Sequence, residues 1–289
     1  MVLLFSLCYN YIEVDIMKTI ILLIISILPV YLIGLYTYKN DREKEPKKLL
    51  TKLFIFGIVS CFPAVILELL LGSFFADPKN MDLITLFIYV LISIALVEEI
   101  CKWFMTYSIS YNHEAFDHIY DAIVYCVFVA LGFALFENIL YVLEGGITTG
   151  ILRAFLSIPG HVCDGIIMGN YLGLAKISSI NNNKQLEKKN LILSIILPTV
   201  AHAIFDFCIL TELTIFYIGF LLLIVWIYVY GIKKIKKVSK VDNNFINNNQ
   251  EKYYVYCPRC GTKRVGKYCQ NCGKHLLESK INSNNNNLT

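Results

Sequence analysis

The stretch TIILLIISILPVYLIGLYTY, which runs from Thr19 to Tyr38, contains no charged side chain. Roughly 20 helical residues are enough to cross the hydrocarbon core of a membrane. A secretory signal peptide would have a basic start, a shorter apolar region and a small-residue cleavage site. Here the apolar residues follow Glu13 and Asp15 and end at Lys39. We therefore expect a retained membrane span rather than a cleaved signal.

Similar apolar stretches recur along the chain, with charged residues bunched between them. The 289 residues are 56% hydrophobic and 17% charged, with a mean hydropathy of +0.58, whereas about a quarter of an ordinary soluble protein is charged. We expect spans at roughly 18–38, 49–75, 83–108, 119–143, 151–176, 191–210 and 213–232. The sequence therefore predicts an all-α polytopic membrane protein with about seven transmembrane helices in a lipid bilayer.

The positions of the basic residues predict how the chain is oriented, because cytoplasmic loops are enriched in Lys and Arg. The loops after the first, fifth and seventh spans hold basic clusters, and the intervening loops carry only Lys79 and Arg153. The loop after the third span holds only His113 and His118 and gives no information on orientation. The clusters are Lys39, Arg42, Lys44, Lys47 and Lys48; Lys176, Lys184, Lys188 and Lys189; and Lys233, Lys234, Lys236 and Lys237. We expect a multi-pass protein of the cell membrane with its N-terminus outside and its C-terminus in the cytosol. Nothing in this charge pattern indicates nucleic-acid binding.

The C-terminal region contains two Cys-x-x-Cys-Gly motifs, Cys257 to Cys260 and Cys269 to Cys272. Paired thiolates of this kind form a tetrahedral four-cysteine zinc site, and the glycine after each pair lets the backbone turn around the metal. A thioredoxin-like redox pair is the alternative, but the flanking sequence lacks the strand–helix pattern. So short a module has too small a core to fold without metal. We expect a small β-hairpin ribbon holding structural zinc.

These features divide the chain into four parts. Residues 1–237 form the membrane domain, 238–252 a flexible linker, 253–277 the zinc ribbon and 278–289 a disordered tail. The linker and tail are rich in asparagine, and polar stretches of this kind bury too little apolar surface to fold.

Ionisable residues occur inside the expected spans, where burying a charge is costly and usually reflects a function. They are Glu98, Glu99 and Lys102 in the third span, Glu137 in the fourth, His161 and Asp164 in the fifth, and His202 and Asp206 in the sixth. Each alone has a simple structural interpretation, such as an ion pair at a helix end or a packed histidine. Their occurrence on consecutive spans favours a shared site.

Helical spacing restricts how these residues can interact. Lys102 is three and four residues after the two glutamates, so it can reach either of them. His202 and Asp206 are one turn apart and form either two metal ligands or a base and its orienting carboxylate. On these span limits Glu98 lies nearer the cytosol and Glu137 nearer the outside. Either the third span is longer or the helices are offset.

The ordered set of motifs resembles the PrsW family of membrane-embedded proteases, related to prenyl-protein CAAX endopeptidases and Abi proteins. The motifs are Glu98-Glu99-x-x-Lys102, Phe133-x-x-x-Glu137-Asn138, Pro159-Gly160-His161 and His202-x-x-x-Asp206. The segment Asp41-Arg42-Glu43-Lys44-Glu45-Pro46 is similar to that family's acidic-basic loop. The resemblance covers most of the membrane domain and leaves out the ribbon.

This resemblance implies an intramembrane endopeptidase that cleaves a membrane-anchored protein, as in site-1 cleavage of an anti-sigma factor. Carried over by motif, Glu98, Glu99, Glu137, His161 and His202 are the catalytic residues, supported by Lys102, Asn138 and Asp206. One arrangement has a glutamate activating water, with the histidines and Asn138 polarising the scissile carbonyl. The other has a catalytic metal held by the histidines and a carboxylate, although HExxH is absent from the sequence.

Three other functions fit parts of the pattern. An ion-coupled transporter also places carboxylates and histidines within spans, but would more often show repeated halves, and none is found here. A non-catalytic family member would bind membrane proteins without cutting them. In the third, the ribbon is the working part and recruits a cytosolic protein to a membrane platform.

Overall fold

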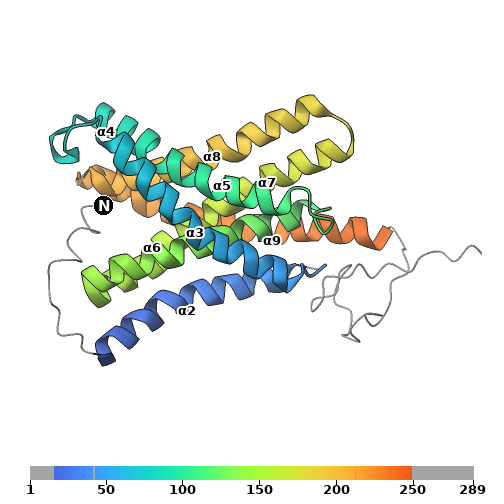
Figure 1. The fold of residues 1–289 in the computed structure, drawn as a ribbon, viewed down its shortest axis with the longest axis horizontal. Helices are drawn as coiled ribbons and strands as arrows, with labels where there is room; N and C mark the ends of the chain where they lie inside the picture. Colours follow the sequence, from blue (N-terminus) through green and yellow to red (C-terminus); the bar gives the residue numbers. More distant parts are fainter. Residues whose placement is uncertain (1–15, 42, 212, 249–289) are drawn as a thin grey trace, which may run out of the picture.

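The computed structural model describes residues 16–41, 43–211 and 213–248, and its elements in these ranges are helices (Figure 1). The expected zinc ribbon and its cysteines, Cys257, Cys260, Cys269 and Cys272, lie outside the described residues. The elements are α2 (Ile16–Asn40), α3 (Lys47–Gly72), η1 (Pro78–Asn80), α4 (Leu83–Tyr89), η2 (Val90–Ala95), α5 (Leu96–Ser110), α6 (Ile119–Phe155), α7 (Ser157–Ile180), α8 (Lys184–Leu210) and α9 (Thr214–Asn248).

Six helical stretches are long and apolar enough to cross a membrane, which makes this a multi-pass membrane protein. Their outer faces carry exposed Ile, Leu, Val and Phe side chains, including Ile84, Phe155 and Leu222. Such a surface suits lipid rather than water. The fourth stretch, Ile119–Ile180, has 62 residues, which is about three times the number needed for one crossing. It contains α6 and α7, which double back on each other.

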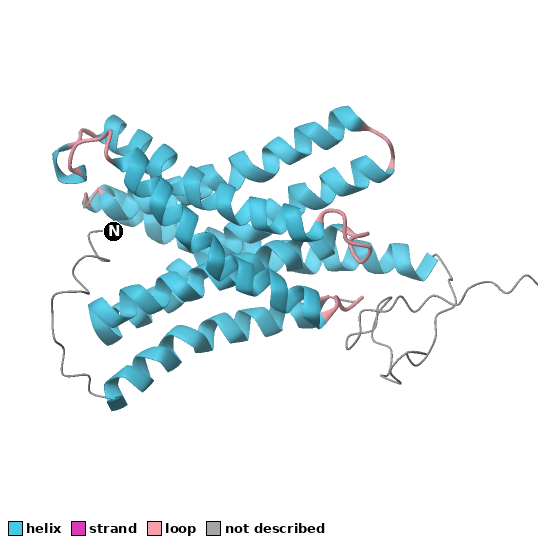
Figure 2. Ribbon diagram, viewed as in Figure 1, coloured by secondary structure: helices cyan, strands magenta, loops and turns pink. Residues whose placement is uncertain are grey.

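The helices run along the long axis of the bundle and are joined at its two ends (Figures 1 and 2). One end holds the loops at 43–46, 111–118 and 181–183, together with the last turns of α9. The other end holds residues 73–82, the bend between α6 and α7, and the end of α8. α9 continues to Asn248, so residues 238–248 of the stretch expected as linker are helical.

α6 and α7 form the centre of the bundle and approach each other closely through small residues of α7. A Cβ atom on Gly169 would lie 2.5 Å from the Cα atom of Ile123, and one on Gly173 would lie 2.8 Å from the Cα atom of Ile119. Small residues at such spacing allow membrane helices to pack backbone to backbone. The close contact fixes the relative depth of the side chains that α6 and α7 carry.

Replacing Gly169 by Ala is therefore expected to lower the midpoint of thermal unfolding in detergent. The new methyl group must push α7 away from Ala122 and Ile123, and overpacking of this kind costs about 1–3 kcal/mol. The matched control is Gly219→Ala on α9, where no atom lies within 4 Å of the added Cβ atom. Equal midpoints for the two variants would contradict the close approach.

Hydrogen bonds tie the loop between α2 and α3 to α2 and to α6. The Lys44 ammonium donates hydrogen bonds to backbone carbonyls at the end of α2, including that of Lys39 at 3.1 Å. The Tyr125 hydroxyl of α6 donates to the Glu45 carboxylate. Burial raises the pKa of Asp41 in this loop to about 7. The acidic-basic segment of the sequence therefore has a structural role in joining α2, α3 and α6.

Candidate active site

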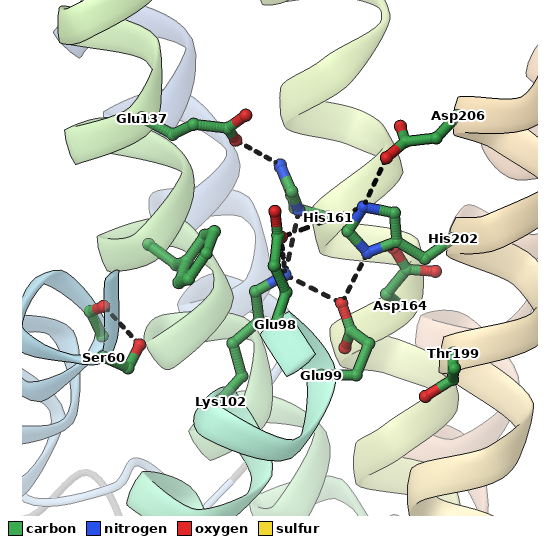
Figure 3. A network of polar contacts seen from close by, with 12 residues as sticks. Ser60, Glu98, Glu99, Lys102, Glu137, His161, Asp164, Thr199, His202 and Asp206 are labelled. Atoms are coloured by element: carbon green, nitrogen blue, oxygen red, sulfur yellow. Dashed lines mark hydrogen bonds and ion pairs between the residues drawn. The ribbon is translucent and has the colours of Figure 1, made fainter. Parts of the chain in front are cut away.

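Ionisable side chains from four helices meet inside the bundle (Figure 3). We call this group the polar cluster. Its members are Glu98, Glu99 and Lys102 on α5, Glu137 on α6, His161 and Asp164 on α7, and His202 and Asp206 on α8. These are the residues that the sequence places inside successive spans, and the fold brings them all together.

A π-helical segment, η2, comes directly before the two adjacent glutamates. It ends at Ala95, and α5 then begins at Leu96. A π-turn inserts an extra residue into a helix and re-aims the side chains that follow, and such turns are frequent at functional sites. Here both carboxylates are turned into the bundle, with Glu98 7% and Glu99 0% exposed. The π-helical segment thus affects the rotation of α5 as a whole, and both carboxylates, about 100° apart around this regular helix, are buried.

Lys102 occupies the centre of the polar cluster (Figure 3). Its Nζ atom lies 3.0 Å from Glu98 Oε2 and 2.8 Å from Glu99 Oε1. The third neighbour is Nδ1 of His161, at 3.2 Å. An ammonium group has three N–H donors, so each of them has an acceptor.

His161 links Lys102 to the glutamate of α6. Its Nε2 atom lies 2.8 Å from Glu137 Oε2, and its Nδ1 atom faces the Lys102 ammonium. An ammonium can only donate and a carboxylate can only accept. Nδ1 therefore carries the lone pair and Nε2 the proton, which leaves both ring nitrogens engaged.

This link accounts for the different depths expected for Glu98 and Glu137. At about 1.5 Å per residue, Glu98 lies about 18 Å from the end of α5 at Ser110, and Glu137 about 27 Å from the start of α6 at Ile119. The end of α5 and the start of α6 are joined by the short loop at 111–118, so the two carboxylates differ in depth by about 9 Å. The His161 side chain bridges this difference.

His202 of α8 is held by a buried carboxylate on one side and faces further carboxylates on the other. Its Nδ1 atom lies 2.9 Å from Glu99 Oε1, so this nitrogen donates. Its Nε2 atom lies 3.4 Å from Asp206 Oδ2 and 3.8 Å from Glu98 Oε2. Glu99 thus orients the ring. Since Nε2 also faces carboxylate oxygens, it is placed to donate as well, which requires a proton on both ring nitrogens.

A cavity of about 690 Å³ adjoins the polar cluster. Glu98, His161 and His202 line it, and it extends to Pro78 and Leu210, which belong to the end of the bundle that holds residues 73–82. Glu99 and Lys102 are not among the residues that line it. The cluster thus has an inner part, closed off from the cavity, and an outer part that a substrate could reach.

Arg153 joins the site because the chain bends sharply at Gly146. In a straight helix Arg153 would lie about 24 Å from Glu137, yet its Nη2 atom is 3.0 Å from Glu137 Oε2 and its Nε atom donates to Asn138 Oδ1 at 3.1 Å. Gly146 has φ 76° and ψ −161°, a backbone conformation open essentially only to glycine. The bend therefore folds the last part of α6 back over the site and gives Glu137 a cationic partner.

Two charged residues of the cavity are not among the site residues predicted from the sequence. They are Arg153, which the sequence presents only as a loop charge, and Glu68 of α3. The lone carboxylate in an apolar stretch was a usable signal for Glu68. Asn138 was expected beside the carbonyl, but it is fully buried behind Arg153 and is not among the cavity-lining residues.

Replacing Arg153 by Ala is expected to lower proteolytic activity about 10- to 100-fold, the usual effect of removing a group that orients a functional residue. The variant leaves Glu137 without its cation, so His161 loses a fixed partner. Arg153→Lys should recover part of the activity, because it keeps the charge without the planar fork. The control is Lys79→Ala, at an exposed residue of the same end of the bundle. Full activity in Arg153→Ala would show that the bend has no role in the site.

The polar cluster also contains a set of metal ligands. Glu98, Glu99, His161 and His202 each offer one ligand atom, and these atoms lie within 4.8 Å of one another. Carboxylates and imidazoles are ordinary ligands of zinc. The hydrogen bond from His161 Nε2 to Glu137 is typical of a metal-binding histidine, whose second ring nitrogen usually donates to a carboxylate. A metal ion held by these four residues would take the space in which Glu98, Glu99 and His161 already contact the Lys102 ammonium.

Comparison of the sequence with known proteins gives matches to one family of proteases. Residues 45–232 match the family described as PrsW family intramembrane metalloprotease. Protease PrsW of Oceanobacillus iheyensis is 36% identical over 211 residues, covering 72% of this chain and 93% of that protein. Protease PrsW of Bacillus subtilis is 33% identical over 218 residues, covering 73% and 92%, respectively. Protease PrsW of Clostridioides difficile is 32% identical over 230 residues, covering 77% and 92%.

No solved structure gives a significant match to this chain. The matched residues include every member of the polar cluster, from α5 through α8. The resemblance noted from the motifs is thus confirmed over most of the membrane domain. The chain belongs to the PrsW family of intramembrane metalloproteases and is an intramembrane protease.

Proposed function

We propose that this protease cleaves a membrane-anchored protein with a water molecule activated by Glu98. The observation that carries the proposal is the division of the polar cluster. Glu98, His161 and His202 line the cavity, whereas Glu99 and Lys102 are not part of its lining. A substrate entering the cavity would meet a carboxylate and imidazoles already held in position.

Glu98 is suited to the role of general base. Its carboxylate lines the cavity, and its Oε2 atom accepts a hydrogen bond from Lys102, which holds the group in position. In the reaction Glu98 takes a proton from water as the water oxygen bonds to the carbonyl carbon. The C–N bond then breaks, and the same carboxyl group returns the proton to the leaving amine.

His202 is suited to stabilise the negative charge that develops on the carbonyl oxygen. Glu99 holds its Nδ1 atom, so Nε2 is directed toward the side of Glu98. Donors fixed in this way before the reaction contribute strongly to catalysis. His161 has both nitrogens engaged and acts by holding Lys102 and Glu137 in register. A metal ion held by Glu98, Glu99, His161 and His202 in place of the Lys102 ammonium would supply Lewis acidity instead.

The topology we propose has seven crossings, with α6 and α7 counted separately. The N-terminus is then outside and the C-terminus in the cytosol, because the lysine clusters lie at the end of the bundle with loops 43–46 and 181–183. The cavity extends toward the opposite end, at Pro78 and Leu210. The substrate in this arrangement is a single-span protein, such as an anti-sigma factor, cut near the outer face.

We propose that residues 253–277 form an accessory zinc ribbon on the cytosolic side of the membrane, where a cytosolic partner could bind it. Its support is the pair of Cys-x-x-Cys-Gly motifs. Cys257→Ser is expected to release zinc from the tail and to leave the thermal unfolding of the membrane helices unchanged. Metal analysis of the purified full chain checks this, with Cys61→Ser, at a buried cysteine of α3, as the control. Equal zinc contents in the Cys257→Ser variant and the wild type would count against the ribbon.

The experiment that tests the proposed function compares membrane proteomes of cells with wild-type protein and with the Glu98→Gln/Glu99→Gln double variant. Truncated single-span proteins present only with the wild type would support proteolysis and identify the substrate. Identical proteomes, with the variant expressed and folded, would instead favour a non-catalytic binding role or ion-coupled transport.

A further inference from the structure

The inner part of the polar cluster has room for one cation. The Lys102 ammonium lies among Glu98, Glu99 and His161, 2.8–3.2 Å from each of their nearest atoms. The Phe133 ring closes the site, with its centroid 4.1 Å from the Lys102 Nζ atom. Lys102 is 2% exposed, so the group is sealed within protein. Three carboxylate or imidazole acceptors and one aromatic face thus surround a single positive charge.

We propose that the Lys102 ammonium is the resident cation of this cage, formed by Glu98, Glu99 and His161, in the position that a metal ion would take. Lys102 and a metal ion then exclude each other, and removing the lysine side chain creates a metal site. The inference concerns which cation the cage holds, and it stands apart from the identity of the substrate.

The first reason for exclusion is the single lone pair on His161. Glu137 accepts the proton on Nε2, so Nδ1 is the nitrogen that could bind a metal. The same Nδ1 lone pair accepts the hydrogen bond from Lys102. One lone pair cannot serve both groups, so a metal ion bound by His161 requires the ammonium to leave.

The second reason is position. A zinc ion lies about 2.0–2.2 Å from nitrogen and oxygen ligands. An ion bound at that distance to the acceptors of Lys102 would overlap the Nζ atom, which is 3.0 Å from Glu98 and 2.8 Å from Glu99. Two cations in contact at a buried site would also repel each other strongly.

The third reason is charge. Glu98 and Glu99 are adjacent and buried, and Lys102 contacts both of them. Buried charges are tolerated when they are paired and hydrogen-bonded. Without the ammonium, the cage would present two carboxylates and a free Nδ1 lone pair, which together form an oxygen-and-nitrogen site that favours a divalent cation.

The test is a titration of the purified full chain with Co²⁺, followed by visible absorption. All proteins carry Cys257, Cys260, Cys269 and Cys272 replaced by Ser, so that the tail thiolates contribute no signal. We expect Lys102→Ala to bind Co²⁺ at least 100-fold more tightly than the parent. The double variant Lys102→Ala/His161→Ala should lose this added Co²⁺ binding. Its loss would show that the ion is bound by the cage and not by Glu43, Asp117 and His118, a second group of side chains that could hold a metal ion. Lys52→Ala, at an exposed lysine, should match the parent.

Two results would overturn the proposal. One is a folded Lys102→Ala variant that gains no Co²⁺ binding. The other is Co²⁺ binding by the parent protein that is abolished when His161→Ala is added to it. The second result needs no lysine variant, so the test remains decisive if Lys102→Ala does not fold. Because the readout is metal binding, its outcome is independent of whether a substrate is cleaved.

Discussion

Glu98→Gln is expected to lower the rate of substrate cleavage by about 10³-fold, while the protein still folds and inserts in the membrane. The amide has nearly the shape of the carboxylate, and its oxygen can still accept the hydrogen bond from Lys102. It cannot take a proton from water, however, so the attacking group is no longer activated. The effect should fall on the rate of the chemical step rather than on substrate binding.

The measurement is the time course of fragment formation for wild type and variant at equal membrane concentration. Glu144→Gln is the matched control, because Glu144 is an exposed carboxylate of α6 outside the cavity. Glu99→Gln should also be inactive, since Glu99 orients His202 and contacts Lys102. Wild-type cleavage by Glu98→Gln would exclude Glu98 as the base.

His202→Ala is expected to lower the cleavage rate by about 10²- to 10³-fold, the usual effect of losing one oxyanion donor. The ring is buried and fixed by Glu99, so its Nε2 atom is held in position before the substrate arrives. Truncation removes that donor and also leaves Glu99 with one partner fewer. His202→Gln should retain part of the activity, because an amide can still donate a hydrogen bond.

His113→Ala is the control for this prediction. His113 is a histidine of the loop between α5 and α6, and it is not among the residues that line the cavity. The cleavage rate and the midpoint of thermal unfolding are measured for each variant. A His202→Ala protein that unfolds like the wild type and cleaves normally would remove His202 from the mechanism. A lower midpoint with an unchanged rate would assign it a packing role alone.

The class of the protein and most of its site could be predicted from the sequence, because the bilayer imposes strong constraints. An uncharged stretch such as Thr19–Tyr38 has few alternatives to a membrane helix. Charge inside such stretches is costly, so Glu98, His161 and His202 stood out without any spatial information. Because they occur in separate membrane helices, they also indicated a shared site in the interior of the bundle.

The remaining features depend on where the chain departs from regular helix. Arg153 follows Glu137 at a distance that a straight helix cannot bridge, and only the bend at Gly146 brings them together. The spacing of apolar residues likewise gives no sign of the π-helical segment that ends just before Leu96. The link from Glu98 to Glu137 through Lys102 and His161 depends on side-chain packing between helices, which span limits taken from hydropathy do not contain.

The most direct test of the central claim is cleavage by the purified protein in liposomes, with the single-span substrate identified from the membrane proteomes. Wild-type and Glu98→Gln proteins are incubated with that substrate in ¹⁸O-labelled water, and the fragments are weighed by mass spectrometry. We predict that wild type alone produces fragments, and that the new C-terminal carboxylate carries ¹⁸O from the water that Glu98 activates. Equal fragment formation by the two proteins would contradict the account.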